Sequence, residues 1–443
     1  MKKTIIILVL VLLSACTTNY KIEYDPVEHN YMPYDKPFLL DDNGQPYLTR
    51  EQAIEDYLYM WKTLEENAPY LADLPNYPQW AENTPQQIKE RYLEDLKGQP
   101  RNMDLDSYAS FMSKSLSELE SVGHIFVIPE SMHEALQTGF KMLYDEYMRD
   151  YISDNEREIF LRIDEFLNNS KTVEFYRHFN NSAARPDDET ERLYFLEEVF
   201  NSNVRFASVY SNVKGNSPYI TIKSFGFPPI IEYLEYAAER LIEFFEKNKD
   251  AENIIIDIRG NRGGNTFIWS EGIVKPLISD TLTSLHMLGF INGGLNTYLW
   301  GGEYPVNLPD DWRNYFPNVG DILRFDTISL SENEYSDNIS VGFNGKIWLL
   351  VDGSSASASD AFAVFCKQTG FATVIGTQTS GTGTGAGSPY AFPLPNSGML
   401  IYYEPWYVFN EDGTCNQIEG TEPDIDVGDR DALDVVRELI AEG

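Results

Sequence analysis

A run of small polar residues at positions 354–360, Ser-Ser-Ala-Ser-Ala-Ser-Asp, holds the residue types that nucleophilic catalysis needs. It follows the apolar run 347–351, which predicts a buried strand, and it precedes the apolar run 361–366, which predicts a buried helix. A serine at such a junction stands at a helix N-terminus, where unpaired backbone N–H groups can stabilise an oxyanion. The alternative is that these residues only cap the helix, because serine and aspartate are favoured at helix starts.

A histidine occupies a second junction that could do chemistry. Residues 104–119 predict a helix, and a strand is predicted to begin just after His124. Gly123 permits a sharp turn there, so the histidine could reach into a cleft and act as a general base. The alternative is a half-buried histidine bonded to a backbone carbonyl.

A glycine-rich loop is the third candidate. The apolar strand predicted at 253–258 runs into Arg-Gly-Asn-Arg-Gly-Gly-Asn at 259–265. Glycines directly after a strand let a ligand approach the backbone and leave N–H groups pointing outward. A phosphate-binding loop is the weaker interpretation, because the G-x-x-x-x-G-K-S/T pattern is absent.

The surrounding pattern predicts a helical first part and an α/β second part. Residues 49–66 predict a helix whose start carries a capping box, Thr49 with Gln52. Strands and helices alternate from residue 205 onward and end in a helix at 432–440. Near the C-terminus, a hairpin turn at 410–413 is predicted between the apolar stretches 400–409 and 415–418.

The amino-acid composition narrows the range of functions that the protein could have. The 443 residues include 34 Lys and Arg against 69 Asp and Glu, and the net charge of −35 argues against binding to nucleic acid or to anionic lipid surfaces. Hydrophobic residues make up 42% of the chain, as in globular proteins. With five histidines, three cysteines and no C-x-x-C or H-E-x-x-H spacing, no metal site is predicted. Cys366 and Cys415 could form a disulfide after export, or Cys366 could simply belong to the core.

The N-terminus is typical of an exported lipoprotein. Lys2 and Lys3 precede a short apolar run, which ends in Leu-Ser-Ala-Cys at 13–16. This segment resembles a bacterial lipobox, which implies that Cys16 is lipidated and becomes the mature N-terminus. Thr17, where an aspartate would favour the inner membrane, points to the outer membrane of the cell envelope. The alternative is an ordinary signal peptide with a chance cysteine.

Four stretches in this order resemble the tricorn and C-terminal-processing family of serine peptidases. They are Val-Gly-His at 122–124, the D-x-R-G-N-x-G-G pattern at 257–264, S-A-S-A-S-D at 355–360 and Glu-Pro-Asp-Ile at 422–425. The resemblance covers about residues 205–430 and the histidine corner. It implies a crotonase-like or ClpP-like β/α catalytic core, preceded here by a helical N-terminal region and without a recognisable PDZ domain.

The resemblance assigns the reacting groups of the core. Ser357, the middle serine of its run, matches the family nucleophile. The N–H of Ala358 would form one half of the oxyanion hole, and Gly263 or Gly264 would supply the other half.

The base is implied to be a histidine. In the processing branch a lysine follows the next strand, but the corresponding position here is Thr382, and no lysine occurs after Lys367. His124 matches the histidine of the tricorn-like branch. Glu419 is the best match for the glutamate that orients it, with Glu422 as the second choice. The serine that can precede this histidine is replaced by Gly123, so Ser121 or a water would have to take that role.

These assignments divide the chain into five regions. They are a lipoprotein signal peptide at 1–16, a tether at 17–48, an N-terminal helical region carrying the histidine at 49–130, a helical insertion at 131–204 and the peptidase core at 205–443.

The sequence therefore predicts a lipid-anchored serine endopeptidase of the cell envelope, with a peptide or protein as substrate and no cofactor. Two alternatives remain open. One is a catalytically inactive family member that binds peptides or glycans, or scaffolds an envelope complex. The other is an enzyme that hydrolyses a non-peptide ester or amide with the same residues. Oligomeric state is not predicted.

Overall fold

The computed structural model describes most of the chain. The described residues are 31–76, 80, 82–119, 122–143, 154–179, 189–211, 215–226, 231–290, 293–300, 322–330, 340–381, 391–409 and 415–442.

The main sheet of the described chain has the strand order β15-β11-β10-β7-β6-β5, and all neighbouring pairs are parallel except β5 with β6. Its strands are β5 (Val204–Ser211), β6 (Gly215–Ile222), β7 (Asn253–Asp257), β10 (Lys346–Val351), β11 (Thr373–Gly376) and β15 (Ile425–Asp426). The helices of this lobe are α9 (Glu189–Asn203), α10 (Ile231–Lys247), α11 (Phe267–Trp269), the π-helix η5 (Ser270–Val274), α12 (Lys275–Leu277), α14 (Ala358–Thr369) and α16 (Ala432–Glu442).

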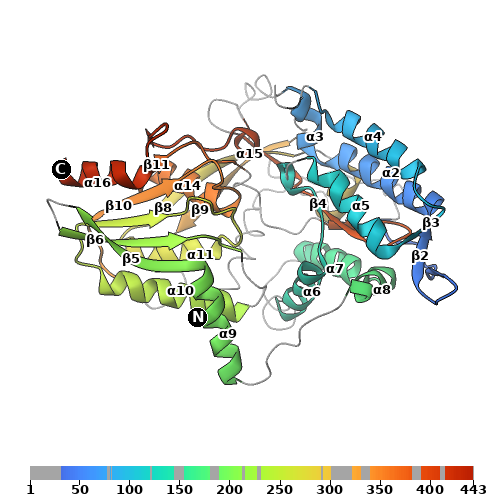
Figure 1. Cartoon of the computed structure of the whole chain (residues 1–443), viewed down its shortest axis with the longest axis horizontal. Helices are drawn as coiled ribbons and strands as arrows, with labels where there is room; N and C mark the ends of the chain where they lie inside the picture. The colour runs from blue at the N-terminus through green and yellow to red at the C-terminus, as the bar shows by residue number, and fades with distance from the viewer. Residues whose placement is uncertain are drawn as a thin grey trace.

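Both faces of this sheet are buried, because alternating side chains of its strands pack against helices on either side. In β7, Ile254 and Ile256 pack with residues of α10 and α14, whereas Ile255 faces the cluster that contains Val436 of α16. Successive side chains of a strand point to opposite faces, so an unbroken apolar strand needs cover on both sides. We call this sheet with its helices the sheet lobe; it lies on the left of Figure 1.

A second, mainly helical unit, the helical lobe, lies on the right of Figure 1. Its helices are α2 (Arg50–Asn67), α3 (Pro69–Asp73), η1 (Leu74–Asn76), α4 (Pro85–Lys97), α5 (Leu105–Ser117), η3 (Val122–His124), α6 (Glu130–Leu143), α7 (Asp154–Asn168), α8 (Ser170–Phe179) and α13 (Gly294–Trp300). Its strands form two small sheets, β1 (Leu39–Leu40), β2 (Pro46–Thr49) and β3 (Asn102–Asp104), and β4 (Phe126–Val127), β12 (Ala391–Pro393) and β13 (Leu400–Tyr402).

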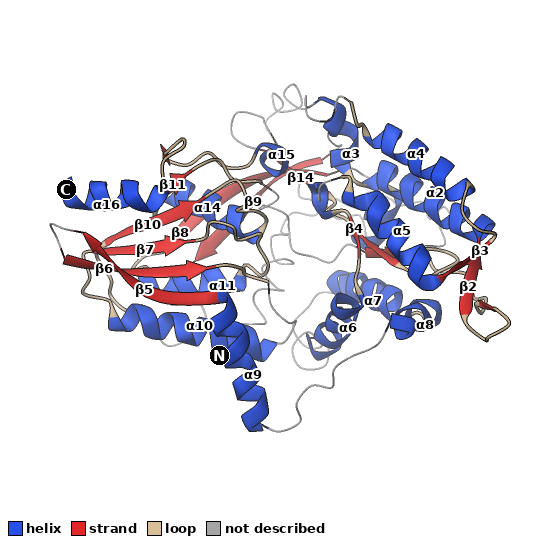
Figure 2. Ribbon diagram, in the orientation of Figure 1, coloured by secondary structure: helices blue, strands red, loops and turns tan. Residues whose placement is uncertain are grey.

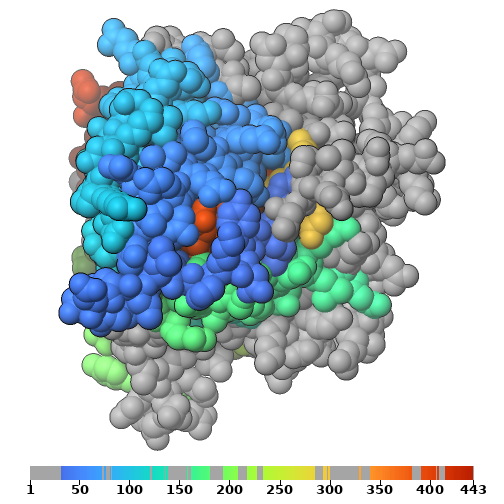
Figure 3. Space-filling view, turned by 90° about the vertical axis from the view of Figure 1, so that its right-hand side faces the viewer, coloured from blue at the N-terminus to red at the C-terminus, as the bar shows by residue number. Residues whose placement is uncertain are grey.

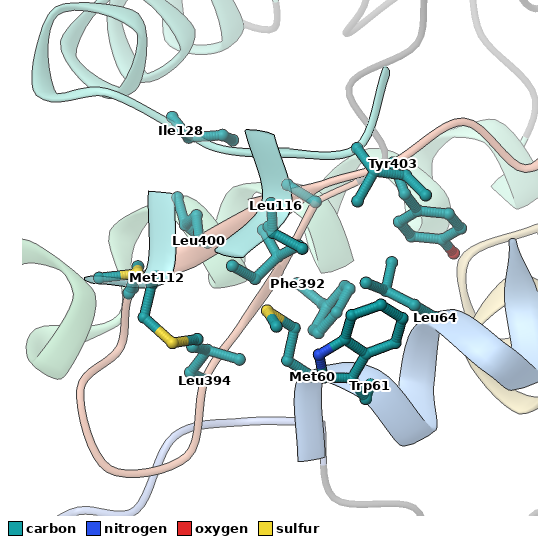
Figure 4. Packing of buried hydrophobic residues seen from close by; sticks show 14 of the residues in the cluster. Met60, Trp61, Leu64, Met112, Leu116, Ile128, Phe392, Leu394, Leu400 and Tyr403 are labelled. Atoms are coloured by element: carbon teal, nitrogen blue, oxygen red, sulfur yellow. The ribbon is translucent and has the colours of Figure 1, made fainter. Parts of the chain in front are cut away.

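Residues far apart in the sequence make up the core of the helical lobe. Trp61, Met112 and Leu116 pack in one buried cluster with Phe392 and Leu400, as Figure 4 shows. In Figure 3, orange-red atoms from late in the chain lie among the blue N-terminal residues. The segment that contains β12 and β13 therefore belongs to the helical lobe by its packing, although it follows α14 of the sheet lobe in sequence.

The two lobes are joined near the top of Figure 2, where α15 (Asn416–Glu419) lies between them. A three-stranded antiparallel sheet also runs there, with β8 (Leu282–Phe290) between β9 (Ile322–Leu330) and β14 (Trp406–Phe409). Within the residues that the structure describes, no helix has the length and apolar character that a membrane span requires.

The α/β fold class and most expected elements are confirmed. The Thr49–Gln52 capping box is present at the start of α2. The expected hairpin near the C-terminus is wrong in one arm, because residues 416–419 form the helix α15 instead of a strand. Its backbone bonds close locally, from Glu419 to Cys415 and from Gly420 to Asn416. The expected turn at 410–413 lies outside the described residues.

Candidate functional site

Ser357 stands where the predicted strand–turn–helix unit places it. It is the N-cap residue of α14, and its φ of 52° and ψ of −127° lie outside the regions that L-residues favour. Two backbone bonds hold it there, from its own N–H to the Gly381 carbonyl (2.8 Å) and from the Ala361 N–H to its carbonyl (2.9 Å). The side chain makes no capping hydrogen bond, so the capping interpretation of this serine is wrong.

His124 reaches that serine from the other lobe. It ends η3, and its Nε2 lies 3.1 Å from Ser357 Oγ. Gly123 precedes it with φ 63°, and a Cβ at this glycine would come within 2.5 Å of the Tyr70 ring. The corner is therefore packed tightly enough to fix the direction of the imidazole.

Backbone strain is concentrated at these two residues. Among the described non-glycine residues, His124 (φ 49°) and Ser357 are the ones with positive φ. Such conformations persist only where the surrounding structure enforces them, and they cluster at active sites. Strain at both members of a hydrogen-bonded Ser–His pair indicates a functional site.

A buried carboxylate completes the arrangement. Glu404 follows β13, its side chain is 4% exposed, and its Oε2 accepts a hydrogen bond from His124 Nδ1 at 2.9 Å. The Glu404 N–H also donates to the Gly123 carbonyl at 2.8 Å, which ties the carboxylate to the histidine corner. With the proton on Nδ1, Nε2 presents its lone pair to the Ser357 hydroxyl. Gln417 of α15 donates from Nε2 to the same Glu404 oxygen at 2.6 Å.

The expectation that Glu419 orients His124 is wrong. Glu419 is exposed at the end of α15, and its backbone carbonyl accepts from Gln378. The second choice, Glu422, is also exposed and uses its carbonyl to accept from Lys367. The error came from matching distance along the chain to the Pro-Asp motif, whereas the glutamate is delivered by a strand of the helical lobe.

Sequence reasoning missed Glu404 and Gln417, although the first left a signal. Glu404 is the one charged residue in the otherwise apolar run 399–409. A carboxylate in a buried strand region needs a partner, and this should have marked it as a candidate. Gln417 gave no comparable signal.

The glycine loop lies against Ser357. Asn261 is fully buried, its Oδ1 accepts from the Gly263 N–H (2.9 Å), and its carbonyl accepts from the Ala356 N–H (3.1 Å). Since the Gly263 N–H is already engaged, Gly264 is the glycine whose N–H is available. Within the described residues, no acceptor takes the N–H of Gly264 or of Ala358.

Steric crowding explains why glycines occupy this loop. A Cβ at Gly263 would come within 2.5 Å of Ser357 Cβ, and a Cβ at Gly264 would collide with the backbone of Phe225 and Gly226. The Phe225 N–H donates to the Gly263 carbonyl, and the Phe225 carbonyl accepts from Asn265. The loop is thereby fixed to the sheet lobe beside the serine.

Asp360 anchors the first turn of α14. It is fully buried, and its Oδ1 accepts from Thr379 Oγ1 at 2.5 Å and from Thr421 Oγ1 at 2.7 Å. Asn416 of α15 donates to Thr421 Oγ1 at 3.1 Å. This network connects α14 with the loop after β11 and with α15.

Two tyrosines, the fully buried Tyr70 and the partly buried Tyr402, lie beside the histidine–carboxylate pair. Burial, followed by the negative charge of Glu404, raises the pKa of Tyr70 and of Tyr402 above the ordinary value. The Tyr402 ring stands edge-on to the imidazole with 6.4 Å between ring centroids. These phenols are therefore neutral near neutral pH and add no charge beside the pair.

The remaining candidates from the sequence are cysteines, possible metal ligands and residues outside the described ranges. No disulfide joins the buried Cys366 and Cys415. Across the described ranges, no cluster of three or more His, Cys, Asp or Glu side chains could hold a metal ion. Cys16, Ser121 and Thr382 lie outside the described residues.

Comparison with known proteins identifies the family resemblance. Residues 216–427 match the model of Peptidase family S41, which confirms the predicted likeness. No curated protein is similar enough to this chain to count as a match.

Several solved structures are similar over most of their length. Mature CPAF in complex with lactacystin is 15% identical, with a TM-score of 0.49 over 89% of this chain and 98% of that one. A lipoprotein from Streptococcus agalactiae is 12% identical, with a TM-score of 0.46 over 92% and 99%. The photosystem II D1 C-terminal processing protease is 13% identical, with a TM-score of 0.39 over 89% and 98%.

Proposed function

We propose that this chain, whose residues 216–427 belong to peptidase family S41, is a serine endopeptidase that uses Ser357 as nucleophile and His124 as general base. The observation that carries the proposal is the hydrogen-bonded series from Ser357 Oγ through both ring nitrogens of His124 to Glu404. A serine hydroxyl is a weak nucleophile at neutral pH and needs a base within hydrogen-bond reach, and 3.1 Å satisfies this.

In the acylation step, Ser357 Oγ attacks the carbonyl carbon of the scissile peptide bond while His124 Nε2 takes the hydroxyl proton. Glu404 holds the imidazole in the required tautomer and stabilises the imidazolium that forms. The negative charge moves to the former carbonyl oxygen, which the N–H groups of Gly264 and Ala358 would bind. Loss of one such donor typically lowers turnover by about 100-fold or more.

The intermediate collapses when the C–N bond breaks and the imidazolium gives its proton to the leaving amine. Water then attacks the acyl–serine ester, with His124 again taking and returning the proton. The peptide is cleaved into an acid and an amine, and Ser357 is regenerated. Apart from the substrate and this one water, the proton transfers of both half-reactions use groups of the chain itself.

We further propose that the protein is lipid-anchored through Cys16 at the outer membrane. The support is the sequence pattern alone: a short basic and apolar leader, then Leu-Ser-Ala-Cys at 13–16 with Thr17 after it. Replacing Cys16 with Ser would leave the protein in the soluble fraction of the envelope, whereas the natural chain would label with radioactive palmitate. Equal labelling of both chains would contradict the anchor.

Labelling with a fluorophosphonate probe tests the catalytic proposal without knowledge of the substrate. The full-length protein in detergent should be labelled, and Ser357→Ala and His124→Ala should each abolish the signal. His178→Ala is the matched control, because this histidine pairs with Asp106 on an exposed surface and should label like the wild type. A folded wild type that does not react would favour an inactive, peptide- or glycan-binding family member.

A further inference from the structure

A buried amide contacts the carboxylate of the proposed relay. Gln417 is 1% exposed and donates from Nε2 to Glu404 Oε2 at 2.6 Å, and this is the same oxygen that accepts from His124 Nδ1. The other carboxylate oxygen has no hydrogen-bond partner in the described part of the chain. Both donors therefore converge on one oxygen, which fixes the rotation of the carboxylate relative to the imidazole.

The Gln417 amide that donates to Glu404 carries no charge, and this affects how the carboxylate interacts with His124. A hydrogen bond to an ionised carboxylate favours the charged form, as a nearby cation would. A glutamine does so without adding a positive charge that would oppose formation of the imidazolium. The Glu404 charge thus remains available to His124.

The helix that carries this amide also supports the nucleophile. The Gln417 carbonyl packs closely against Gly381, where a Cβ would come within 2.8 Å of it, and the Gly381 carbonyl accepts from the Ser357 N–H. The neighbouring Asn416 reaches the Asp360 network through Thr421. A four-residue helix therefore contacts the structures that hold both reacting residues.

We propose that Gln417 is a positioning residue of the hydrolytic site, which acts by holding the Glu404 carboxylate against His124. The inference rests on the proposed serine mechanism. It assigns to Gln417 no contact with the substrate and no proton transfer.

The test is the rate of fluorophosphonate labelling as a function of pH for the full-length protein and for Gln417→Met. Met keeps the bulk of the side chain and removes the donor. We expect labelling to slow by about tenfold or more, because a hydrogen bond to a buried charge is lost. We also expect the pH profile of the rate to change, because with one donor fewer the Glu404 charge acts on the His124 ring alone.

The other titratable groups that face this pair are Ser357, Tyr70 and Tyr402, with Cys415 near Tyr70, and the substitution leaves all of them in place. A protein that merely folds less well would lose amplitude without a shift of the profile. Gln378→Met is the matched control, because Gln378 also donates a side-chain amide to α15, at the Glu419 carbonyl (2.8 Å), without contacting Glu404. It should keep both the rate and the profile of the wild type.

The outcomes separate this inference from the proposed function. If the wild type labels at Ser357 and Gln417→Met has the same rate and profile, the positioning role is wrong while the serine mechanism stands. An equal effect of Gln378→Met would likewise overturn it, since support of α15 would then explain the loss. If the wild type does not label, the serine mechanism itself fails. Should Gln417→Met not fold, Gln417→Asn carries the same test, because it keeps an amide but draws it back from Glu404.

In a Glu404→Gln background, Gln417→Met should cause almost no further loss, because residues that act as a unit are not additive. Additive losses in this double-mutant cycle would contradict action through Glu404.

Discussion

Individual residues of the proposed site are held by backbone geometry more than by side-chain bonds. Ser357 and His124 both adopt positive φ, and each is fixed by a neighbour that has no Cβ or that donates through its backbone. The oxyanion donors are also backbone groups. Substitutions that add a single carbon at the glycines of the loop should therefore displace these backbone groups.

Gly264→Ala tests the assignment of the oxyanion donor. A Cβ there would collide with the backbone of Phe225 and Gly226 and would displace the N–H, so labelling should slow by about 100-fold or more. Gly260→Ala is the control, because Gly260 also has positive φ (77°) but a Cβ added there would have no other atom within 4 Å. It should lose about 1 kcal/mol of stability and keep its labelling rate within a few-fold. Similar rates for the two variants would contradict the assignment.

The identity of the carboxylate gives a second prediction at this scale. Glu404→Gln should slow labelling by about a thousandfold or more, because the tautomer and the charge that support His124 are lost. Glu419→Gln, at the residue matched from sequence, should label like the wild type. The reverse order of rates would restore the sequence assignment.

Among the elements, the β12–β13 segment links α2 to the site. Asp56 of α2 is fully buried and accepts from the backbone N–H groups of Asn396 (2.7 Å) and Ser397 (3.0 Å) and from the Tyr108 hydroxyl (2.9 Å). Asn396 and Ser397 form the turn before β13, which leads directly to Glu404. The buried carboxylate thus holds the segment that delivers the relay glutamate.

Asp56 also makes stability depend on pH. Burial raises its pKa to about 6, and the hydrogen bonds lower it only in part. The carboxyl group of Asp56 ionises at a lower pH in the unfolded chain than in the folded protein. Its favourable contribution to the free energy of unfolding is therefore fully present below about pH 4 and is lost as the pH rises through about 6. The loss is on the order of 3 kcal/mol. Urea unfolding of the wild type and of Asp56→Asn should show a difference in stability that changes across this range; parallel curves would contradict it.

Sequence patterns predicted the elements that carry local signals. Ser357, the pair Gly263 and Gly264, and Ala358 became candidates because an apolar strand, a glycine-rich turn and a helix start are each visible within a few residues, and the family resemblance then assigned their roles. Glu404 was missed because its position depends on β13 pairing with β4, more than half the chain away in sequence. The charge within an apolar run marks Glu404 as a candidate, but nothing local indicates that this strand pairs next to His124. The helix α15 was also missed, since its polar residues Asn416 and Gln417 are buried by partners that only the fold supplies.

At the scale of the whole molecule, the two lobes each supply part of the site. Ser357 and the glycine loop belong to the sheet lobe, whereas His124 and Glu404 belong to the helical lobe through η3, β4 and β13. Neither lobe alone holds a base beside a nucleophile. Activity should therefore require that the lobes stay docked.

Weakening the helical lobe should consequently impair a site whose nucleophile lies elsewhere. Leu116→Ala removes a buried side chain from the core drawn in Figure 4 and should cost about 2–5 kcal/mol. In urea, this variant should lose fluorophosphonate labelling at a lower concentration than the wild type. Leu161→Ala, at an exposed leucine of the same lobe, should not. Equal midpoints for Leu116→Ala and wild type would contradict the dependence on docking.

The central claim is that Ser357 is activated by a histidine base. The most direct measurement is peptide mapping of the wild-type fluorophosphonate adduct, combined with the pH dependence of its rate of formation. We expect one adduct on Ser357, formed faster at higher pH because a protonated base cannot take the hydroxyl proton. An adduct on another residue, or a rate on Ser357 that does not change with pH, would contradict it.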